Sequence, residues 1–451
     1  MAVEEKKVRP INRLGTVKHV RPIVDKMYQE GIEATSSGKP VAWAMVNWWH
    51  ADPILKAMDF IVIYPENYGA ACAAAGAAPE YLNRCEVEGF PTHLCGYARN
   101  CIGYTQKMIE LGEVPPDAPM GGMAKPSLLL GSGFFCDARF KWFQALERYW
   151  EVPVWVMEVP QPKAKEGLTE GVFDYSIKFM IEELKEFVAF LERLTGKKMN
   201  WDVLSEVVDT QEKVLRTWYE INDLRKAVPC PMHSRDFWTM MVPAFYRAGE
   251  KTSLELYEEV LQEVKERVAN KIGAIGAGTL EEEKYRLAFV ELPPWHSLRF
   301  FDRLAEKGWN FVIETWNYHP PPPLAELKEI SDPLERIARL VYWYYTNMNL
   351  NAVTGGRTAG AMVEAYVQYT REYKLDGALI HPLISCRCNA VYPLHVRDVL
   401  ERDAIVPALV APGDIVDLSV FDEAQVLSQA DAFVESMEHY RKLRKEKGLS
   451  Y

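Results

Sequence analysis

The sequence predicts an α/β protein with two doubly wound parallel-sheet lobes joined by a helical segment. Short apolar runs alternate with amphipathic stretches at both ends of the chain, a pattern typical of parallel strands with crossover helices. Between them, residues 172–269 carry helical periodicity and almost no strand signal. A chain of 451 residues is long enough for two or three domains. We expect them to span 1–170, 171–275 and 276–451.

The N-terminal lobe is predicted from four apolar runs, each followed by a helical pattern. Pro22 and Pro53 fall in the first turn of a predicted helix, where the missing amide hydrogen costs nothing. An Ala-rich segment indicates a packed helix. The expected strands cover 41–47, 60–63, 127–130 and 152–159, and the expected helices cover 22–30, a segment from 52, 68–78, 95–110 and 137–149.

The helical segment and the C-terminal lobe follow from the same reasoning. Long amphipathic helices are expected over 175–194 and 254–268, and the Gly-rich stretch 273–278 then breaks the chain. Strands are expected at 285–290, 311–314, 378–380 and 405–410, with helices from 298, over 334–344 and 359–373, and from 422. The two lobes show no internal sequence repeat.

Charge and hydropathy exclude several classes of partner. The formal net charge of -11 argues against a nucleic-acid or anionic-membrane surface as the main partner. No stretch reaches the roughly 18 uncharged apolar residues that a membrane helix needs. The first thirty residues are charged and resemble no signal peptide. We therefore expect a cytoplasmic protein.

Three of the eight cysteines lie where a sheet of this kind places its ligands. Cys136 and Cys386 follow predicted buried strands, and Cys95 opens a predicted helix after a Gly-Phe-Pro turn. In a cytoplasmic protein, cysteines serve metal binding or catalysis more often than disulfides. Cys95, Cys136 and Cys386 are therefore the predicted metal ligands.

The spacing of these thiols favours an iron-sulfur cluster over zinc. Zinc sites usually show paired cysteine or histidine ligands a few residues apart, and this sequence has no such set. Single cysteines on three separate loops suit a cluster held between domains. Three thiolates would leave one iron open to substrate or water.

The remaining cysteines and the histidines could have either a structural or a functional role. Cys72 lies in an Ala-rich helix and is expected to pack in the core. His50 ends the first strand beside the expected thiols, so it is the candidate proton donor, with a structural role as the alternative. The same ambiguity holds for His233 and His381. A dry aromatic pocket around the cluster is predicted from Trp48, Trp49, Trp142 and Trp295.

Several motifs resemble the benzoyl-CoA reductase and 2-hydroxyacyl-CoA dehydratase family. They are residues 89–100 (GFPTHLCGYARN), 136–144 (CDARFKWFQ), 292–297 (LPPWHS), 376–386 (DGALIHPLISC) and 414–417 (DIVD). Their order is most similar to that of the larger cluster-bearing subunit of ATP-dependent benzoyl-CoA reductases. The resemblance spans nearly the whole chain and is least specific in the helical middle.

The resemblance implies a fold of two α/β lobes with a helical segment, and it implies that Cys95, Cys136 and Cys386 hold a low-potential [4Fe-4S] cluster. It also implies a related cluster-bearing subunit, a separate ATP-hydrolysing iron-sulfur activator, and one-electron reduction of an aromatic acyl-CoA. No Walker A motif occurs in the sequence, so ATP hydrolysis falls to the activator.

Alternatives remain open within and beyond the family. One is a 2-hydroxyacyl-CoA dehydratase subunit. Another is a homodimeric reductase of small molecules with an [8Fe-9S] double cubane, for which Cys85, Cys101, Cys230 and Cys388 could supply further thiolates. An electron-transfer subunit whose cluster never meets substrate is a third.

Overall fold

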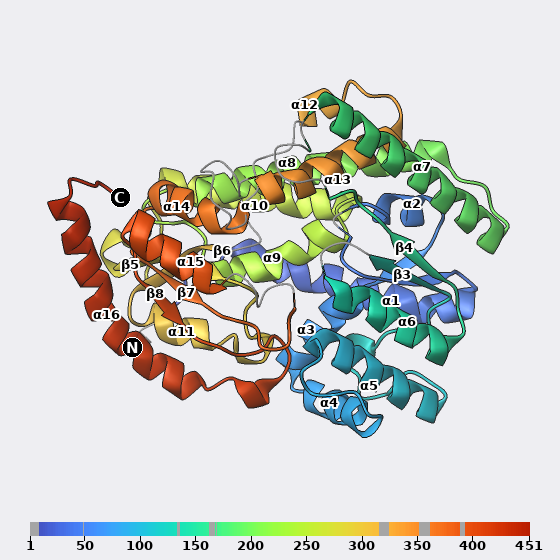
Figure 1. The fold of residues 1–451 in the computed structure, drawn as a ribbon, viewed down its shortest axis with the longest axis horizontal. Coiled ribbons are helices and arrows are strands. Elements are labelled where there is room, and N and C mark those ends of the chain that lie inside the picture. The colour runs from blue at the N-terminus through green and yellow to red at the C-terminus, as the bar shows by residue number, and fades with distance from the viewer. Residues whose placement is uncertain are drawn as a thin grey trace, which may run out of the picture.

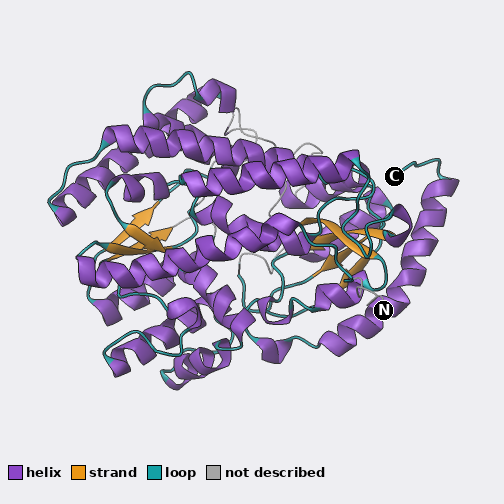
Figure 2. Ribbon diagram, turned by 180° about the vertical axis from the view of Figure 1, so that it is seen from behind, coloured by secondary structure: helices purple, strands orange, loops and turns teal. Residues whose placement is uncertain are grey.

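The computed structural model describes residues 9–47, 49–132, 136–161, 167, 169–314, 324–350, 361–387 and 393–451. It contains two four-stranded sheets, ordered β2-β1-β3-β4 and β6-β5-β7-β8, and every strand pair is parallel. Figure 2 shows the two sheets well apart, each enclosed by helices. The predicted α/β class with two parallel-sheet lobes is confirmed.

The N-terminal lobe contains the strands β1 (Val41–Ala44), β2 (Ile61–Ile63), β3 (Leu128–Ser132) and β4 (Val154–Met157). Its helices are α1 (Val20–Ser37), α2 (Asp52–Ala57), α3 (Pro65–Ala75), α4 (Ala78–Val87), α5 (Gly96–Leu111) and α6 (Asp137–Trp150). The single helix expected over 68–78 is wrong. Gly76 ends α3 in the left-handed conformation, with φ of 75°, and α4 then begins.

Four long helices join the lobes: α7 (Glu170–Thr195), α8 (Trp201–Leu224), α9 (Ser234–Tyr246) and α10 (Lys251–Ala269). The predicted helical segment is therefore confirmed in its secondary structure. Figure 1 shows α9 lying between the two sheets. Nine residues of α9 are buried, so this helix forms part of the core.

The C-terminal lobe contains β5 (Tyr285–Val290), β6 (Trp309–Glu314), β7 (Gly377–Ile380) and β8 (Ala408–Val410). Its helices are α11 (Phe300–Ala305), α12 (Leu324–Leu327), α13 (Pro333–Leu350), α14 (Ala361–Tyr373), α15 (Pro393–Val399) and α16 (Glu423–Glu446). The strand expected over 405–410 starts only at Ala408. Ile405, with φ of 53°, ends a π-helical turn instead.

The two sheets have equivalent strand orders, although the sequence shows no repeat. In both, the first strand along the chain lies between the second and the third, and the fourth strand is at an edge. One hydrophobic core extends through both lobes and the long helices. The domain boundaries at 1–170, 171–275 and 276–451 stay a prediction. No described helix has the length and apolar character needed to cross a bilayer.

Candidate functional site

One cavity, of about 150 Å³, is lined by Cys95, Cys136 and Cys386 together. Segments that follow strands of both sheets supply much of its wall: Val46 after β1, Cys136 after β3 and Cys386 after β7. The carboxyl ends of parallel strands are the usual ligand side of such sheets. The three thiols predicted from distant loops therefore share one site between the lobes.

Two of the thiols lie at helix N-termini. Cys95 is the N-cap residue of α5, and Cys136 is the N-cap residue of α6. Burial raises the pKa of Cys95 to about 12; the amides of Ala98 and Tyr97 act against the rise, and the nearby Cys136 adds to it. A bound metal would have to displace the thiol proton. The positive ends of two helix dipoles would then favour the resulting negative charge.

The loop that carries Cys386 is held against α5 by a hydrogen-bond network. The amide of Gly96 donates to Ser385 Oγ at 3.1 Å, and Ser385 Oγ donates to the Asp414 carboxylate. Asp414 Oδ1 in turn accepts from the amides of Val416 (2.9 Å) and Asp417 (3.0 Å). The neighbours of two candidate ligands are thus joined directly across the lobes.

A buried arginine makes a second connection between the lobes near the thiols. Arg99, on the first turn of α5, donates to Asp417 Oδ2 at 3.1 Å and to the carbonyl oxygen of Thr92 at 3.0 Å. It also pairs with Glu86. Only 2% of the Arg99 side chain is exposed, so this pair is poorly screened by solvent and fixes the start of α5.

The walls of the cavity are mostly apolar and aromatic. Trp295 Nε1 donates to Tyr97 Oη at 2.6 Å, and the Trp295 ring meets Trp238 edge to face at 6.0 Å. The helix α9 supplies one wall through Trp238, Met241, Val242, Phe245 and Tyr246. The segment expected only to bridge the lobes therefore forms part of the site.

The charges among the described lining residues belong to one ion pair. Arg139, in the first turn of α6, lies 3.1 Å from Glu66 in the first turn of α3. Both also bond to Val46: its amide donates to Glu66 at 2.7 Å, and its carbonyl oxygen accepts from Arg139. The pair ties together the loops that follow β1, β2 and β3.

The other described cysteines do not line this cavity. Cys72, Cys85, Cys101 and Cys230 are buried in the core. Trp142 is a neighbour of the Cys101 thiol and also lines the cavity. Cys388 lies outside the described residues. The core packing expected for Cys72 agrees with its full burial.

The donor set suits a cluster better than a single ion. Among the described residues, no three His, Cys, Asp or Glu side chains converge closely enough to hold one metal ion. Thiolates of an iron-sulfur cluster bind different irons and are therefore spaced more widely. Soft sulfur donors around an apolar cavity match the ligands that such clusters take.

The histidines predicted as candidates are buried. His50 follows β1 but is not among the residues that line the cavity, and burial lowers its pKa to about 3. His381 Nδ1 bonds to the Leu292 carbonyl oxygen at 2.7 Å, and His233 Nδ1 accepts from the Arg235 amide at 2.9 Å. The two latter imidazoles thus hold backbone in place.

The predicted tryptophans divide between the cavity and the core. Trp142 and Trp295 line the cavity, whereas Trp49 donates to the Ala244 carbonyl oxygen at 2.7 Å and stacks on Phe245 behind it. Trp48 lies outside the described residues.

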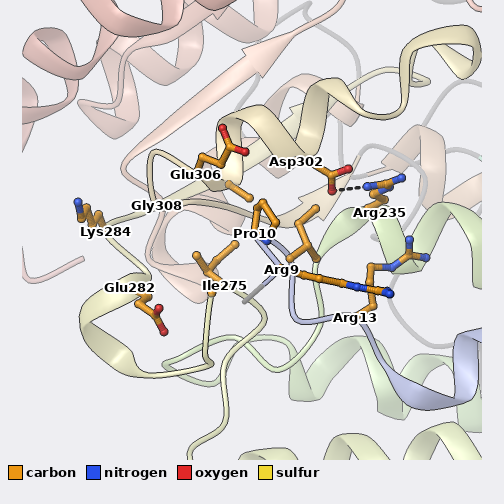
Figure 3. A pocket seen from close by; sticks show the side chains of 13 residues that line it. Arg9, Pro10, Arg13, Arg235, Ile275, Glu282, Lys284, Asp302, Glu306 and Gly308 are labelled. Carbon is orange, nitrogen blue, oxygen red and sulfur yellow. Dashed lines mark hydrogen bonds and ion pairs between the residues drawn. The ribbon is translucent and has the colours of Figure 1, made fainter. Parts of the chain in front are cut away.

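A larger pocket, of about 890 Å³, opens at the opposite ends of the C-terminal sheet strands (Figure 3). Lys284 and Gly308, which line it, immediately precede β5 and β6. Its described lining contains no cysteine, and Arg235 is paired with Asp302. The amino ends of parallel strands are not the usual ligand side, so the cysteine cavity is the better candidate for the reaction.

Several residues of the site cannot be identified from the sequence, because their role depends on how the chain folds. Gly96, Ser385 and Glu66 gave no chemical signal, although the first two stand beside predicted ligands. The Asp414-Ile-Val-Asp417 segment carries part of the family resemblance, but its sequence does not indicate which residues it contacts. Trp238 and Met241 appeared only as part of an amphipathic helix pattern.

The chain is similar to known proteins along nearly its whole length. The sequence model described as 2-hydroxyglutaryl-CoA dehydratase, D-component, matches residues 48–437. The chain is 25% identical over 428 residues to the (R)-2-hydroxyisocaproyl-CoA dehydratase alpha subunit of Clostridioides difficile, covering 94% of this chain and 97% of that one. It is 24% identical to the (R)-phenyllactyl-CoA dehydratase alpha subunit of Clostridium sporogenes, covering 90% and 92%. It is 25% identical to a benzoyl-CoA reductase subunit of Thauera aromatica, covering 79% of each chain.

Proposed function

Because the chain belongs to the family of the 2-hydroxyglutaryl-CoA dehydratase D-component, we propose that it is the cluster-bearing subunit of a 2-hydroxyacyl-CoA dehydratase. The sequence motifs favoured a benzoyl-CoA reductase and kept the dehydratase as an alternative. The relatives support the alternative better, since two dehydratase alpha subunits match 94% and 90% of the chain and the reductase subunit matches 79%.

The observation that carries this proposal is the convergence of Cys95, Cys136 and Cys386 on one apolar cavity. A [4Fe-4S] cluster held there would supply low-potential single electrons to a thioester. The four other described cysteines lie away from the cavity, which favours a single cubane over an [8Fe-9S] double cubane.

The chain's own residues would hold the cluster, orient its thiolate ligands and shield the cavity from water. The N-termini of α5 and α6 offset the negative charge of the Cys95 and Cys136 thiolates. The Gly96, Ser385 and Asp414 network holds the third thiol in place across the lobes. Aromatic walls exclude water, which strengthens electrostatic interactions inside the cavity.

We retain His50 as a candidate for proton transfer. Its lowered pKa keeps the imidazole neutral near pH 7 and makes it a weak base, so proton transfer at this position would start from the neutral ring. Its nearest link to the cavity is through the loop after β1, which carries Val46. Replacement of His50 by glutamine tests the role: loss of turnover with unchanged iron content supports it, and full turnover removes it.

The proposed subunit works with partners. The two dehydratase relatives named above are alpha subunits, which supports assembly with a second, related subunit. We assign ATP hydrolysis to a separate iron-sulfur activator, which is consistent with a sequence that carries no Walker A motif. The substrate would be an acyl-CoA thioester.

Reductive chemistry on an aromatic thioester is the second candidate, because the cavity is walled by tryptophan and tyrosine and a benzoyl-CoA reductase subunit is among the relatives. The test is anaerobic assay of the assembled enzyme with activator and ATP. Conversion of 2-hydroxyacyl-CoA to the 2-enoyl-CoA supports the dehydratase. Reduction of benzoyl-CoA without dehydration supports the reductase and rejects the first proposal.

A further inference from the structure

The cysteine cavity has a chemical character that bears on the acyl group of the substrate. Beyond the three thiols, its described lining is dominated by large apolar side chains, which come from four separate segments of the chain. Trp142 comes from α6, Trp238 and Met241 from α9, Leu292 from the segment after β5, and Ile415 from the segment after β8. An acyl chain that enters this space leaves water for hydrocarbon and aromatic surface.

The charges of the lining residues also favour an uncharged acyl group. Arg139 and Glu66 are the charged side chains among the described lining residues, and they lie 3.1 Å apart. Both are further engaged by the Val46 backbone. A carboxylate that entered the cavity would therefore meet a guanidinium already neutralised by Glu66, and the Glu66 carboxylate would repel it. An ionised group buried without its own cation is strongly disfavoured.

The aromatic wall is also fixed in shape. Trp295 is held by its hydrogen bond to Tyr97 Oη and packs edge to face on Trp238, which is 2% exposed. Tyr97 belongs to α5 and Trp295 follows β5, so the two lobes share this wall. A rigid wall of this kind selects by shape and polarity and cannot rearrange to hydrate a charge.

We propose that this site accepts a 2-hydroxyacyl-CoA whose acyl chain is uncharged and apolar, either branched aliphatic or aromatic, and that it rejects an acyl chain carrying a second carboxylate. The inference rests on the proposed function and narrows it. The family alone does not decide the point, because its relatives carry names that include both isocaproyl and glutaryl groups.

The first test compares three probes on the assembled, cluster-loaded enzyme: 2-hydroxyisocaproyl-CoA, phenyllactyl-CoA and 2-hydroxyglutaryl-CoA. We expect kcat/KM for one of the two apolar thioesters to exceed that for the glutaryl thioester by about 10³-fold or more, since burial of an ionised carboxylate without a partner cation is strongly unfavourable. A glutaryl thioester turned over as well as the better apolar one overturns the inference.

Equilibrium binding separates this inference from the proposed reaction. Three tryptophans line the cavity, so their fluorescence reports occupancy by each thioester without turnover. Tighter binding of an apolar thioester without dehydration would reject the dehydratase function and leave the specificity standing. Equal affinity for the glutaryl thioester, or binding of no thioester, overturns the specificity.

A charge-insertion variant gives the converse test. Met241 is a half-buried lining residue on α9, and Met241→Arg would place a guanidinium in the wall. We expect the preference for apolar over glutaryl thioester to fall by at least about tenfold in Met241→Arg and by clearly less in Met241→Gln, which has a similar size and no charge. Equal shifts in both variants would mean that charge in this wall does not set the preference.

Discussion

The amide of Gly96 donates a 3.1 Å hydrogen bond to Ser385 Oγ, which joins the neighbours of Cys95 and Cys386 across 289 positions of sequence. The close packing around Gly96 leaves no room for a side chain at this position. A Cβ there would lie 2.7 Å from Asp414 Oδ1 and 3.0 Å from Val416 Cβ. Glycine at this position is therefore part of the way in which the two lobes meet.

Replacement of Gly96 by alanine should destabilise the protein and lower its iron content. The added methyl group overpacks the contact with Asp414, which we expect to reduce the free energy of unfolding by about 1–3 kcal/mol. Denaturant unfolding and iron analysis measure the two effects. Gly171→Ala in α7 is the matched control, because a Cβ there meets nothing within 4 Å. An equal loss in both variants would contradict the role of the contact.

The buried ion pair between Arg225 and Glu314 should be essential to stability. Their two hydrogen bonds are 2.9 Å and 2.6 Å long, and neither side chain is exposed. Glu314→Leu would leave the guanidinium buried without its carboxylate and should cost about 3–5 kcal/mol in unfolding free energy. The exposed pair of Lys185 and Glu182 gives the control, and Glu182→Gln should leave the denaturation midpoint unchanged. A small effect of Glu314→Leu would show that the cation finds other partners.

Asp52 should make stability fall as pH rises from about 4 to about 7. Burial raises its pKa to about 7, while hydrogen bonds to Asn47 and Tyr64 act against the rise. The folded state then binds more protons than the unfolded state in that window, so unfolding free energy decreases with pH. The effect should be on the order of 4 kcal/mol, from 1.36 kcal/mol per unit of pKa. Asp52→Asn should remove this component of the pH dependence; an identical profile in the variant would refute the assignment.

The thiols could be predicted from sequence because each follows a local signal, either a strand end or a helix start. The α/β class with two parallel-sheet lobes followed from the alternation of strands and helices in the same way, whereas the order of the strands within each sheet did not. The contact of Gly96 with Ser385 could not, because nothing near either residue records where the chain returns 289 positions later. The role of α9 as a wall of the cavity could not be predicted, for a similar reason. Its apolar stripe predicts burial but does not say that Trp238 and Met241 are buried around a cavity.

The two errors in secondary structure have local causes. Gly76 was read as part of an Ala-rich helix, although its φ of 75° ends α3. Ile405 has strand propensity, yet it takes a left-handed conformation at the end of a π-helical turn, and pairing with β7 begins only at Ala408. Glycine adopts this conformation freely at the end of a helix, whereas Ile405 adopts it against the preference of a β-branched residue.

The choice between a single and a double cubane can be tested at Cys101. This thiol is fully buried, with Trp142 and Thr105 as neighbours. Cys101→Ala should keep the wild-type iron and acid-labile sulfide content. Loss of iron in this variant, with the fold retained by circular dichroism, would favour a larger cluster.

Iron and acid-labile sulfide counting on anaerobically purified wild-type protein and on Cys386→Ala tests whether the three thiols hold a cluster. We expect about four irons and four sulfides per wild-type chain, and their loss from the folded variant. A wild-type chain that binds no cluster, or a variant that keeps a full one, would contradict this assignment.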